Sequence, residues 1–235
     1  PSVCVEAVRA YGRRRSAPCA PLIGATRDAN AHVALAAIDA LAASCEPVVA
    51  AVSRLSTLAR ELPLGVTSRL EARGSWHYGA HAAVSLAHLA PDSARGIIAR
   101  LMAHPTWQVR MYAARAAGDL ADTASLRAAA QDAADNVRSA AVVALSGLIR
   151  PAQQPNAAPA AIDRTPGIDS IFVAALKRRD YQLVLEAARA LEGAPATASL
   201  VDALFVALDR ISLERRETSR DPRMELLARI EAVGG

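Results

Sequence analysis

Apolar and polar residues follow one another along this chain with the period of an amphipathic helix, and the same pattern recurs at seven places. If one apolar residue near the start of each pattern is taken as its origin, small or apolar residues return four, seven, eight and eleven positions later. These offsets lie on one face of a helix with about 3.6 residues per turn. The pattern predicts six clear helices and a less regular seventh. Their origins are Val3, Val33, Tyr78, Val109, Val137, Leu183 and, for the seventh, the region of Met224.

The segment from His104 to Arg150 shows that these helices belong to a repeat. Laid on itself so that Val109 falls on Val137, it also brings Arg110 onto Arg138. Each unit consists of a short helical segment, here called A, and a longer patterned one, called B. Such units, repeated along a chain, are typical of α-solenoids. We therefore predict an all-α fold, an α-solenoid (superhelix) of about six to seven helix pairs.

Two sequence segments of this repeat resemble a known family. VRMYAARAAGDL, beginning at Val109, and VRSAAVVALSGL, beginning at Val137, resemble the second helix of a HEAT repeat, commonly written V-R-x-x-A-A-x-A-L-G-x-L. The match is good for these two repeats and partial for the others. The resemblance implies a superhelical stack of HEAT-like helix pairs with the B helices along the concave side. It also implies service as a protein-binding scaffold.

Prolines and small polar residues mark the expected helix starts. Pro18, Pro47, Pro91 and Pro195 stand where A helices should begin, and Asn30 is an expected cap of a B helix. The stretch LPLGVTSRLEARGS reads as an irregular connection, with one helical turn around residues 68–71. Residues 150–167 are rich in Pro and Ala and should form an exposed inserted loop. We treat residues 1–235 as a single HEAT-repeat domain.

Composition agrees with helices and limits the classes of partner. Apolar residues make up 52% of the chain and aromatic residues only 3%, and the frequent alanines favour closely packed helices. The formal charge is +4 with a pI of about 9.4, and Lys177 is the only lysine. Arginine binds carboxylates and phosphates bidentately. We nevertheless favour a solvated basic face over nucleic-acid binding.

The three cysteines and the first residues of the chain lead to two further expectations. Cys4, Cys19 and Cys45 show no C-x-x-C spacing and are odd in number, so we expect buried or free thiols. The chain begins without methionine, and the helix around Val3 looks like a B helix without its A helix. We infer a fragment of a longer or processed protein. No apolar run approaches the ~20 residues that span a bilayer, so no membrane partner is expected.

Candidate binding residues emerge when one repeat position is compared across helices. Trp76, Trp107 and Tyr181 stand two residues before their origins, where aromatic side chains either pack between repeats or anchor a partner. Six residues after the origin, opposite the apolar stripe, a second column would line the concave groove. Its arginines would suit an acidic peptide or phosphate, although a solvated face with intrahelical ion pairs explains them equally well. This column contains Arg9, Asp39, Val84, Arg115, Val143 and Arg189.

Two polar patterns have a structural and a functional interpretation. Every residue just before an origin is polar, and we favour a helix-capping role over a ligand-binding ladder. His77 and His81 are four apart on one helix, but His88 lies about 10 Å further along the axis than His81, too far to share an ion. We expect no metal site. The residues before the origins are Ser2, His32, His77, Gln108, Asn136 and Gln182.

Catalytic relatives of HEAT proteins give little match. The His-Glu dipeptides of the HEAT-like hydroxylases are absent from the sequence, and no motif specific to bilin lyases is found. Trp107, Arg110, Arg115 and Asp119 loosely resemble the tryptophans, arginines and carboxylate of HEAT-like alkylpurine glycosylases. No triad, nucleophile elbow or phosphate loop is recognisable. The region from Asp180 onward resembles the HEAT part of some bacterial cyclophilin-type peptidyl-prolyl isomerase proteins, which implies an auxiliary arm of a larger enzyme.

The sequence therefore predicts a non-catalytic scaffold that binds a protein or peptide through the concave face, and the arginines of this face would suit an acidic one. The partner-binding residues would be Trp76, Trp107, Tyr181, Arg9, Arg115 and Arg189. No cofactor and no metal are expected. The alternatives are a substrate-presenting domain of a larger enzyme and a nucleic-acid-binding protein of the glycosylase type, whose affinity would fall steeply with salt.

Overall fold

The computed structural model describes residues 2–14, 17–43, 45–62, 76–149, 163–216 and 218–234. These residues form thirteen α-helices and one pair of two-residue strands, which confirms the predicted all-α class. The helical turn predicted around residues 68–71 and most of the predicted inserted loop lie outside the described residues.

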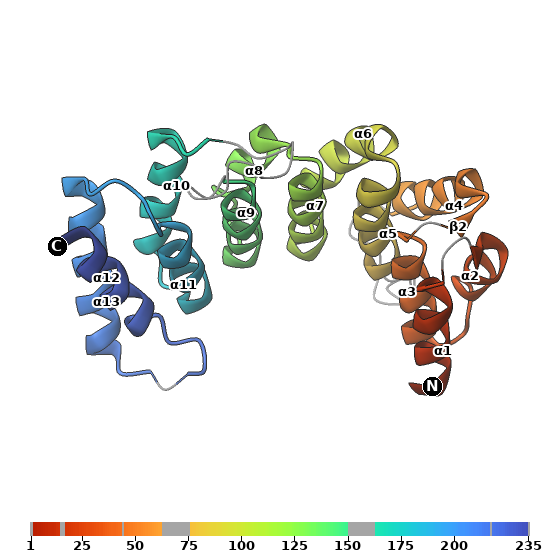
Figure 1. Ribbon diagram of the computed structural model, residues 1–235, viewed down its shortest axis with the longest axis horizontal. Helices are drawn as coiled ribbons and strands as arrows, with labels where there is room; N and C mark the ends of the chain where they lie inside the picture. The colour runs from red at the N-terminus through yellow and green to blue at the C-terminus, as the bar shows by residue number, and fades with distance from the viewer. Residues whose placement is uncertain are drawn as a thin grey trace. The chain divides into compact units, whose positions relative to one another are not determined.

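All seven predicted B helices are present, each containing its expected origin (Figure 1). The A helices alternate with them along the chain. The B helices are α1 (Ser2–Gly12), α3 (Ala31–Ala40), α5 (Trp76–Leu89), α7 (Trp107–Asp119), α9 (Asp135–Leu148), α11 (Tyr181–Ala190) and α13 (Arg223–Gly234). The A helices are α2 (Cys19–Ala25), α4 (Val48–Arg60), α6 (Pro91–Met102), α8 (Thr123–Ala129), α10 (Pro166–Leu176) and α12 (Ala198–Glu214).

The chain forms two compact units, Pro1–Leu120 (unit 1) and Ala121–Gly235 (unit 2). In unit 1 the B helices pack in sequence order, α1 on α3, α3 on α5 and α5 on α7, with the A helices covering their other side. In unit 2 the same arrangement places α11 between α9 and α13. Each B helix therefore has a face between its neighbours and a face away from the A helices.

Alanine and glycine allow the helices of unit 1 to approach closely. Ala113 and Ala116 of α7 are fully buried, as the repeat pattern predicts. Gly79 of α5 faces α4, and a Cβ atom there would lie 2.6 Å from Cδ1 of Leu62 and 3.0 Å from the carbonyl oxygen of Leu58. A real Cβ does not come so close to another atom. The separation of α4 and α5 therefore depends on a residue without a side chain.

Arginines on the A helices tie successive A helices together. Arg100 of α6 donates to two carbonyl oxygens at the C-terminus of α4, at 2.9 and 3.1 Å. Arg210 of α12 donates in the same way to two carbonyl oxygens at the end of α10, both at 3.0 Å. The last carbonyl groups of a helix have no partner within the helix. A guanidinium group satisfies them and also complements the negative end of the helix dipole.

The arginine of the HEAT-like sequence motif V-R also has a structural role. Arg110 of α7 donates to the main-chain oxygen of His104 at 2.7 Å, six residues earlier. Arg138 of α9 donates to the main-chain oxygen of Asp132, again six residues earlier, and also pairs with Asp135. In both repeats the side chain holds the turn between the A and B helices against the B helix.

The expectation of free thiols is wrong for two of the three cysteines. Cys19 and Cys45 form a disulfide, and both are almost fully buried. The bond lies where β1 (Ala17–Pro18) pairs in parallel with β2 (Cys45–Glu46). The pairing of two segments 26 residues apart depends on how the first repeat folds back, which cysteine spacing alone does not show. Cys4 is free and exposed.

Helix α1 keeps the repeat register but not the burial of its equivalents. Val3 is 79% exposed, whereas Val109, the equivalent residue of α7, is fully buried. Ala7 and Ala10 are likewise exposed, and none of the residues of α1 is buried. Among the described residues, α1 packs mainly on α3.

Candidate binding surface

The column six residues after each origin lies on the outer side of the B helices, as the helical period predicts. The side chains of Arg9, Asp39 and Arg189 are 57%, 56% and 55% exposed. Arg115 is also exposed, and Val143 is 49% exposed. The face of the B helices away from the A helices therefore presents polar and charged groups to solvent.

A chain of hydrogen bonds crosses this face in unit 1 and joins three helices. Asp39 of α3 lies with Oδ1 2.7 Å from Nδ1 of His81 on α5. Nε2 of the same imidazole lies 3.0 Å from the hydroxyl of Tyr112 on α7. A carboxylate only accepts, so Nδ1 carries the proton, and in the neutral ring Nε2 accepts from the phenol. We call these three residues the Asp39–His81–Tyr112 chain.

Aromatic and cationic groups gather around the tyrosine end of this chain. The Trp76 ring lies 5.9 Å from the ring of Tyr112 and stacks on His77 at 3.7 Å. The guanidinium of Arg115 lies over the Tyr112 ring, 4.9 Å from its centre. Burial lowers the pKa of His77, and the nearby His81 lowers it further. Two predicted partner-binding residues, Trp76 and Arg115, thus meet at one place.

The predicted arginines differ in how far they are already neutralised. Arg9 pairs with Glu6 at 2.7 Å, one turn away on α1. Arg189 pairs with Glu186 at 3.5 Å and with Glu225 of α13 at 3.9 Å. For Arg115, no carboxylate within the described ranges lies at ion-pair distance. Its guanidinium contacts the Tyr112 ring and, at 3.9 Å, the sulfur of Met111. Of the three predicted arginines, Arg115 alone has no carboxylate partner among the described residues.

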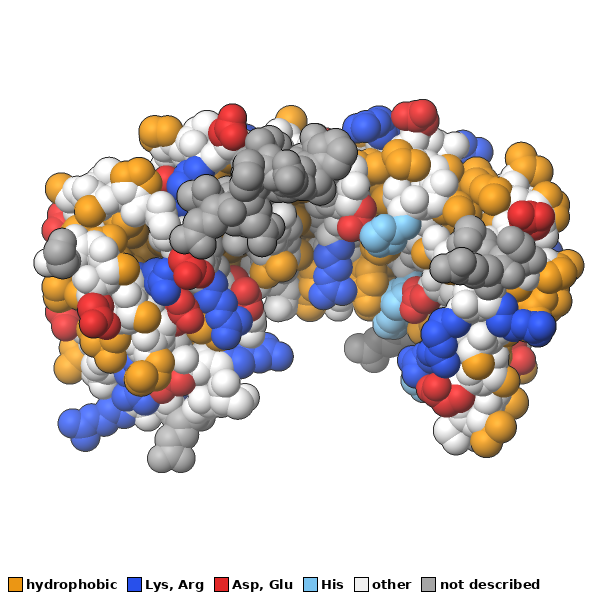
Figure 2. Space-filling view, viewed as in Figure 1, with side chains coloured by type: hydrophobic (Ala, Val, Ile, Leu, Met, Phe, Trp, Pro, Cys, Tyr) orange, Lys and Arg blue, Asp and Glu red, His pale blue; other side chains and the backbone are white. Residues whose placement is uncertain are grey.

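A groove of about 520 Å³ lies beside the chain, between α1, α3 and α5. Val5, Leu35 and Ala36 contribute its apolar part. In Figure 2, side chains of both charges and the histidines gather over this part of unit 1. Polar side chains complete its lining: Ser2, Glu6, Arg9, His32, Asp39 and His81.

Another contact between a histidine and a carboxylate of unit 1 lies near the C-terminus of α7. Nε2 of His88 lies 3.3 Å from Oδ2 of Asp119. Burial raises the pKa of the Asp119 carboxyl, and His88 opposes this effect. The three histidines of α5 therefore face different groups, and His88 does not join the Asp39–His81–Tyr112 chain. No group of three or more His, Cys, Asp or Glu side chains that could hold a metal ion is found in the part of the chain that the structure describes.

The other predicted aromatic residues lie apart from this cluster. Trp107, at the start of α7, is 36% exposed. Tyr181, at the start of α11 in unit 2, is only 8% exposed, and the guanidinium of Arg216 covers its ring at 5.4 Å. Burial and the neighbouring Glu214 carboxylate raise the pKa of Tyr181. The expectation that Tyr181 offers an exposed aromatic anchor is therefore corrected, because its ring packs within unit 2.

At two B helices the cap is not the residue just before the origin. The cap of α3 is Asn30, whose Oδ1 accepts from the main-chain nitrogens of His32 and Val33. The cap of α11 is Asp180, which accepts from the nitrogen of Leu183. Both caps stand three residues before the origin, since a capping side chain must precede the first helical turn. Asn30 was predicted correctly, whereas the capping role preferred for the other column is not supported at these two helices.

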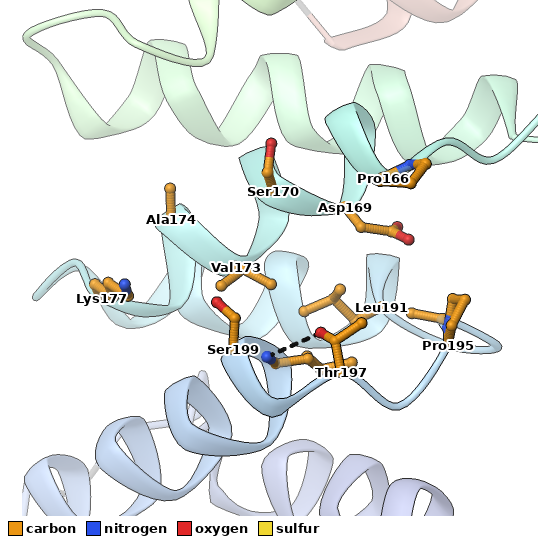
Figure 3. A pocket seen from close by; sticks show the side chains of 12 residues that line it. Pro166, Asp169, Ser170, Val173, Ala174, Lys177, Leu191, Pro195, Thr197 and Ser199 are labelled. Carbon is orange, nitrogen blue, oxygen red and sulfur yellow. Dashed lines mark hydrogen bonds between the residues drawn. The ribbon is translucent and has the colours of Figure 1, made fainter.

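Unit 2 has a further groove that the sequence did not indicate. It lies between α10 and the start of α12, has a volume of about 380 Å³ and is mainly apolar (Figure 3). Val173, Leu191 and Pro195 line it, with Lys177 at one end and the α12 cap Thr197 at its edge. The A helices vary in length and carry no regular pattern, so no sequence column identifies this groove.

Comparison with known proteins supports the fold. No protein-family model matches the chain, and no curated protein sequence does either. Among solved structures, an engineered protein is 18% identical, with a TM-score of 0.53, over 92% of this chain and 99% of its own. At this identity the likeness shows the fold alone. The chain is an all-α helical-repeat solenoid.

Two other solved structures are similar at lower scores. A designed armadillo repeat protein in complex with the peptide (KR)4 is 16% identical, with a TM-score of 0.48, over 89% of this chain and 98% of its own. The complex of CpcE and CpcF of phycocyanin lyase from Nostoc sp. is 15% identical, with a TM-score of 0.41, over 94% of this chain and 96% of its own. None of these comparisons supports the link to a cyclophilin-type isomerase. No helix within the described residues is long and apolar enough to cross a membrane.

Proposed function

We propose that this chain is a non-catalytic scaffold that binds a protein or peptide through the B-helix face of unit 1. The observation that carries this proposal is the cluster around Tyr112, where Trp76, His81 and Arg115 from two helices meet on the solvent side. Aromatic rings and arginine are the side chains that contribute most to protein interfaces. Here they are held by contacts between helices, which reduces the entropy lost when a partner binds.

The partner proposed for this surface carries an acidic side chain that binds Arg115. The guanidinium is exposed, faces no carboxylate of the described residues and is held by its stacking on Tyr112. A planar guanidinium binds a carboxylate through two parallel hydrogen bonds. Arg9 and Arg189 are weaker candidates, because each would first have to release a glutamate of this chain.

The test compares charge reversal at Arg115 with the same change elsewhere. The immobilised chain and its Arg115→Glu and Arg95→Glu variants are incubated with nuclease-treated lysate of the source organism at moderate salt. Arg95 lies on α6 with an exposed side chain and serves as the control. Retained proteins are quantified by mass spectrometry, and the affinity of a purified candidate is then measured for each variant.

We expect a protein that the wild type and Arg95→Glu retain equally and that Arg115→Glu binds at least about tenfold more weakly, since charged hydrogen bonds contribute about 1.5–3 kcal/mol. Arg115→Lys should recover only part of the affinity, because lysine lacks the bidentate geometry. Equal retention by all three proteins would show that the partner binds elsewhere. Retention that requires nucleic acid and disappears at high salt would instead favour the nucleic-acid alternative.

A further inference from the structure

The geometry of the Asp39–His81–Tyr112 chain points to a reactive site: we infer that Tyr112 is a base-assisted nucleophile that accepts an acyl group from an activated ester. In hydrolases a nucleophile is activated when its hydroxyl is hydrogen-bonded to an imidazole whose other nitrogen donates to a carboxylate. The two distances here are 3.0 and 2.7 Å. This reaction is separate from partner binding and does not require it, and because the acyl group stays on Tyr112 it is a modification of the scaffold, not catalysis.

The three groups take distinct roles because of the atoms they present. Asp39 accepts the Nδ1 proton and holds the ring of His81 with Nε2 toward Tyr112. His81 is the base, and its side chain is only 21% exposed, so few waters compete for Nε2. Asp39 is a positioning residue that also stabilises the imidazolium formed when His81 takes the proton.

Other features of the surface support charge development on the phenol oxygen. The positive guanidinium of Arg115 lies over the Tyr112 ring and stabilises negative charge as the proton leaves. His81 and Asp39 also line the groove between α1, α3 and α5. The groove, of about 520 Å³, therefore reaches His81, the residue to which the Tyr112 hydroxyl is hydrogen-bonded, while Tyr112 itself does not line it.

The proposed step transfers the acyl group and one proton. The Tyr112 oxygen forms a bond to the carbonyl carbon while its proton passes to Nε2 of His81. The bond between that carbon and the leaving group then breaks, and Nε2 returns the proton to the leaving group. The products are the ester of Tyr112 and the free leaving group, with His81 neutral again. No oxidant, metal or other reactant is needed.

The chemistry of phenol restricts the substrate class. A phenolate leaves more readily than an alkoxide or an amine anion, so attack on an amide or an alkyl ester would mainly reverse. The acyl donor must carry a leaving group at least as good as a phenolate, as in aryl esters and thioesters. We therefore assign the site to activated acyl compounds rather than to peptides.

The experiment measures acetylation of each tyrosine by p-nitrophenyl acetate at neutral pH. Release of p-nitrophenol gives the overall rate, and peptide mass spectrometry gives the rate at Tyr112 separately from the other tyrosines and from Lys177. Tyr11 is an internal control, because its hydroxyl donates to the carbonyl of Pro18, which cannot take a proton. We expect Tyr112 to react at least about tenfold faster than Tyr11.

Variants separate a reactive site from a structural network. His81→Gln should lower the rate at Tyr112 by about 100-fold, the lower end of general-base effects. Asp39→Asn should lower it too, and Asp39→Glu should restore part of it. His88→Gln, on the same helix but facing Asp119, should leave it unchanged.

Folding of each variant is checked by circular dichroism and thermal melting, so a lost reaction is not confused with lost structure. The inference is overturned if Tyr112 of the folded wild type reacts no faster than Tyr11. It is also overturned if folded His81→Gln acetylates Tyr112 at the wild-type rate, which would make the hydrogen bonds structural only. Neither result depends on whether a partner binds Arg115.

Discussion

At the scale of single residues, arginine serves two purposes in this chain, and its place in the helix pair separates them. Arg100, Arg110 and Arg210 donate to main-chain oxygens at helix ends and turns and hold successive elements together. Arg115 lies on the outer side of a B helix and rests on an aromatic ring instead. A basic composition therefore does not by itself indicate a basic surface, since some of the arginines bind main-chain oxygens at helix ends and turns.

The sequence identified part of the candidate site and missed its centre. Arg115 and Trp76 stood out because each repeats a residue type in its own column. His81 and Tyr112 both stand three residues after their origins, and neither histidine nor tyrosine recurs in this column, since the other repeats carry Glu6, Ala36, Ala140 and Glu186 there. Their bonds with Asp39 run between helices, and lateral spacing between helices is not encoded in any single periodic pattern.

Tyr181 leads to a prediction about alkaline stability. Because its pKa is raised in the folded protein, the unfolded chain loses this proton first, at about pH 10. The contribution of Tyr181 to the free energy of unfolding is therefore fully present below about pH 10. It is lost as pH rises from about 10 toward the higher pKa of Tyr181 in the folded protein. Tyr181→Phe should reduce this loss of stability. The test is to measure the denaturant midpoints of the variant and the wild type between about pH 9 and pH 11. Tyr11→Phe is the control, and an equal alkaline slope in Tyr181→Phe and wild type would contradict the assignment.

At the scale of elements, the helical period predicts the B helices, whereas each A helix begins and ends at local signals. Each B helix buries a stripe of small residues against two neighbours, so its sequence repeats with the helical period. The A helices depend more on local stops. Helix α12 ends at Glu214 because Arg215 takes a left-handed conformation with φ of 49°. A non-glycine residue in this region is uncommon, and the charged sequence after it gives no sign of the stop.

Two glycines in helices of unit 1 lead to a paired prediction. Gly79→Ala places a Cβ against Leu62 and the main chain of Leu58, so α4 and α5 must separate. We expect a loss of about 1–3 kcal/mol, as for other overpacked cores. Gly96 of α6 has no atom within 4 Å of an added Cβ, so Gly96→Ala should stabilise by up to about 1 kcal/mol through helix propensity.

Urea denaturation of both variants measures these effects side by side. The two substitutions are chemically identical and both lie inside helices, so they change helix propensity by the same amount. The difference between their effects on the free energy of unfolding therefore reports the contact between Gly79 and α4. Stabilisation of the protein by Gly79→Ala would mean that α4 and α5 do not approach as closely as described.

At the scale of the whole molecule, the repeat predicted the all-α solenoid, because one packing solution reused along the chain leaves one sequence pattern. Features that occur once leave no such pattern. The disulfide between Cys19 and Cys45 depends on two segments that meet in the first repeat, and the groove between α10 and α12 depends on the particular side chains of one pair of A helices. The exposed column of the B helices is predictable in part. Its position on each helix follows from the helical period, but the residue type at that position changes from helix to helix.

The disulfide should contribute strongly to the stability of unit 1. It closes a loop over a sequence separation of 26 residues, and the loss of chain entropy in the unfolded state corresponds to about 3.5 kcal/mol. The double variant Cys19→Ser and Cys45→Ser should therefore unfold at lower denaturant concentration than the wild type by about that free energy. Reducing agent should shift the wild type in the same direction and leave the double variant unchanged. Cys4→Ser, which removes the exposed free thiol, is the control and should behave as wild type. Unfolding of the wild type that is insensitive to reducing agent would show that Cys19 and Cys45 are not joined in the purified protein.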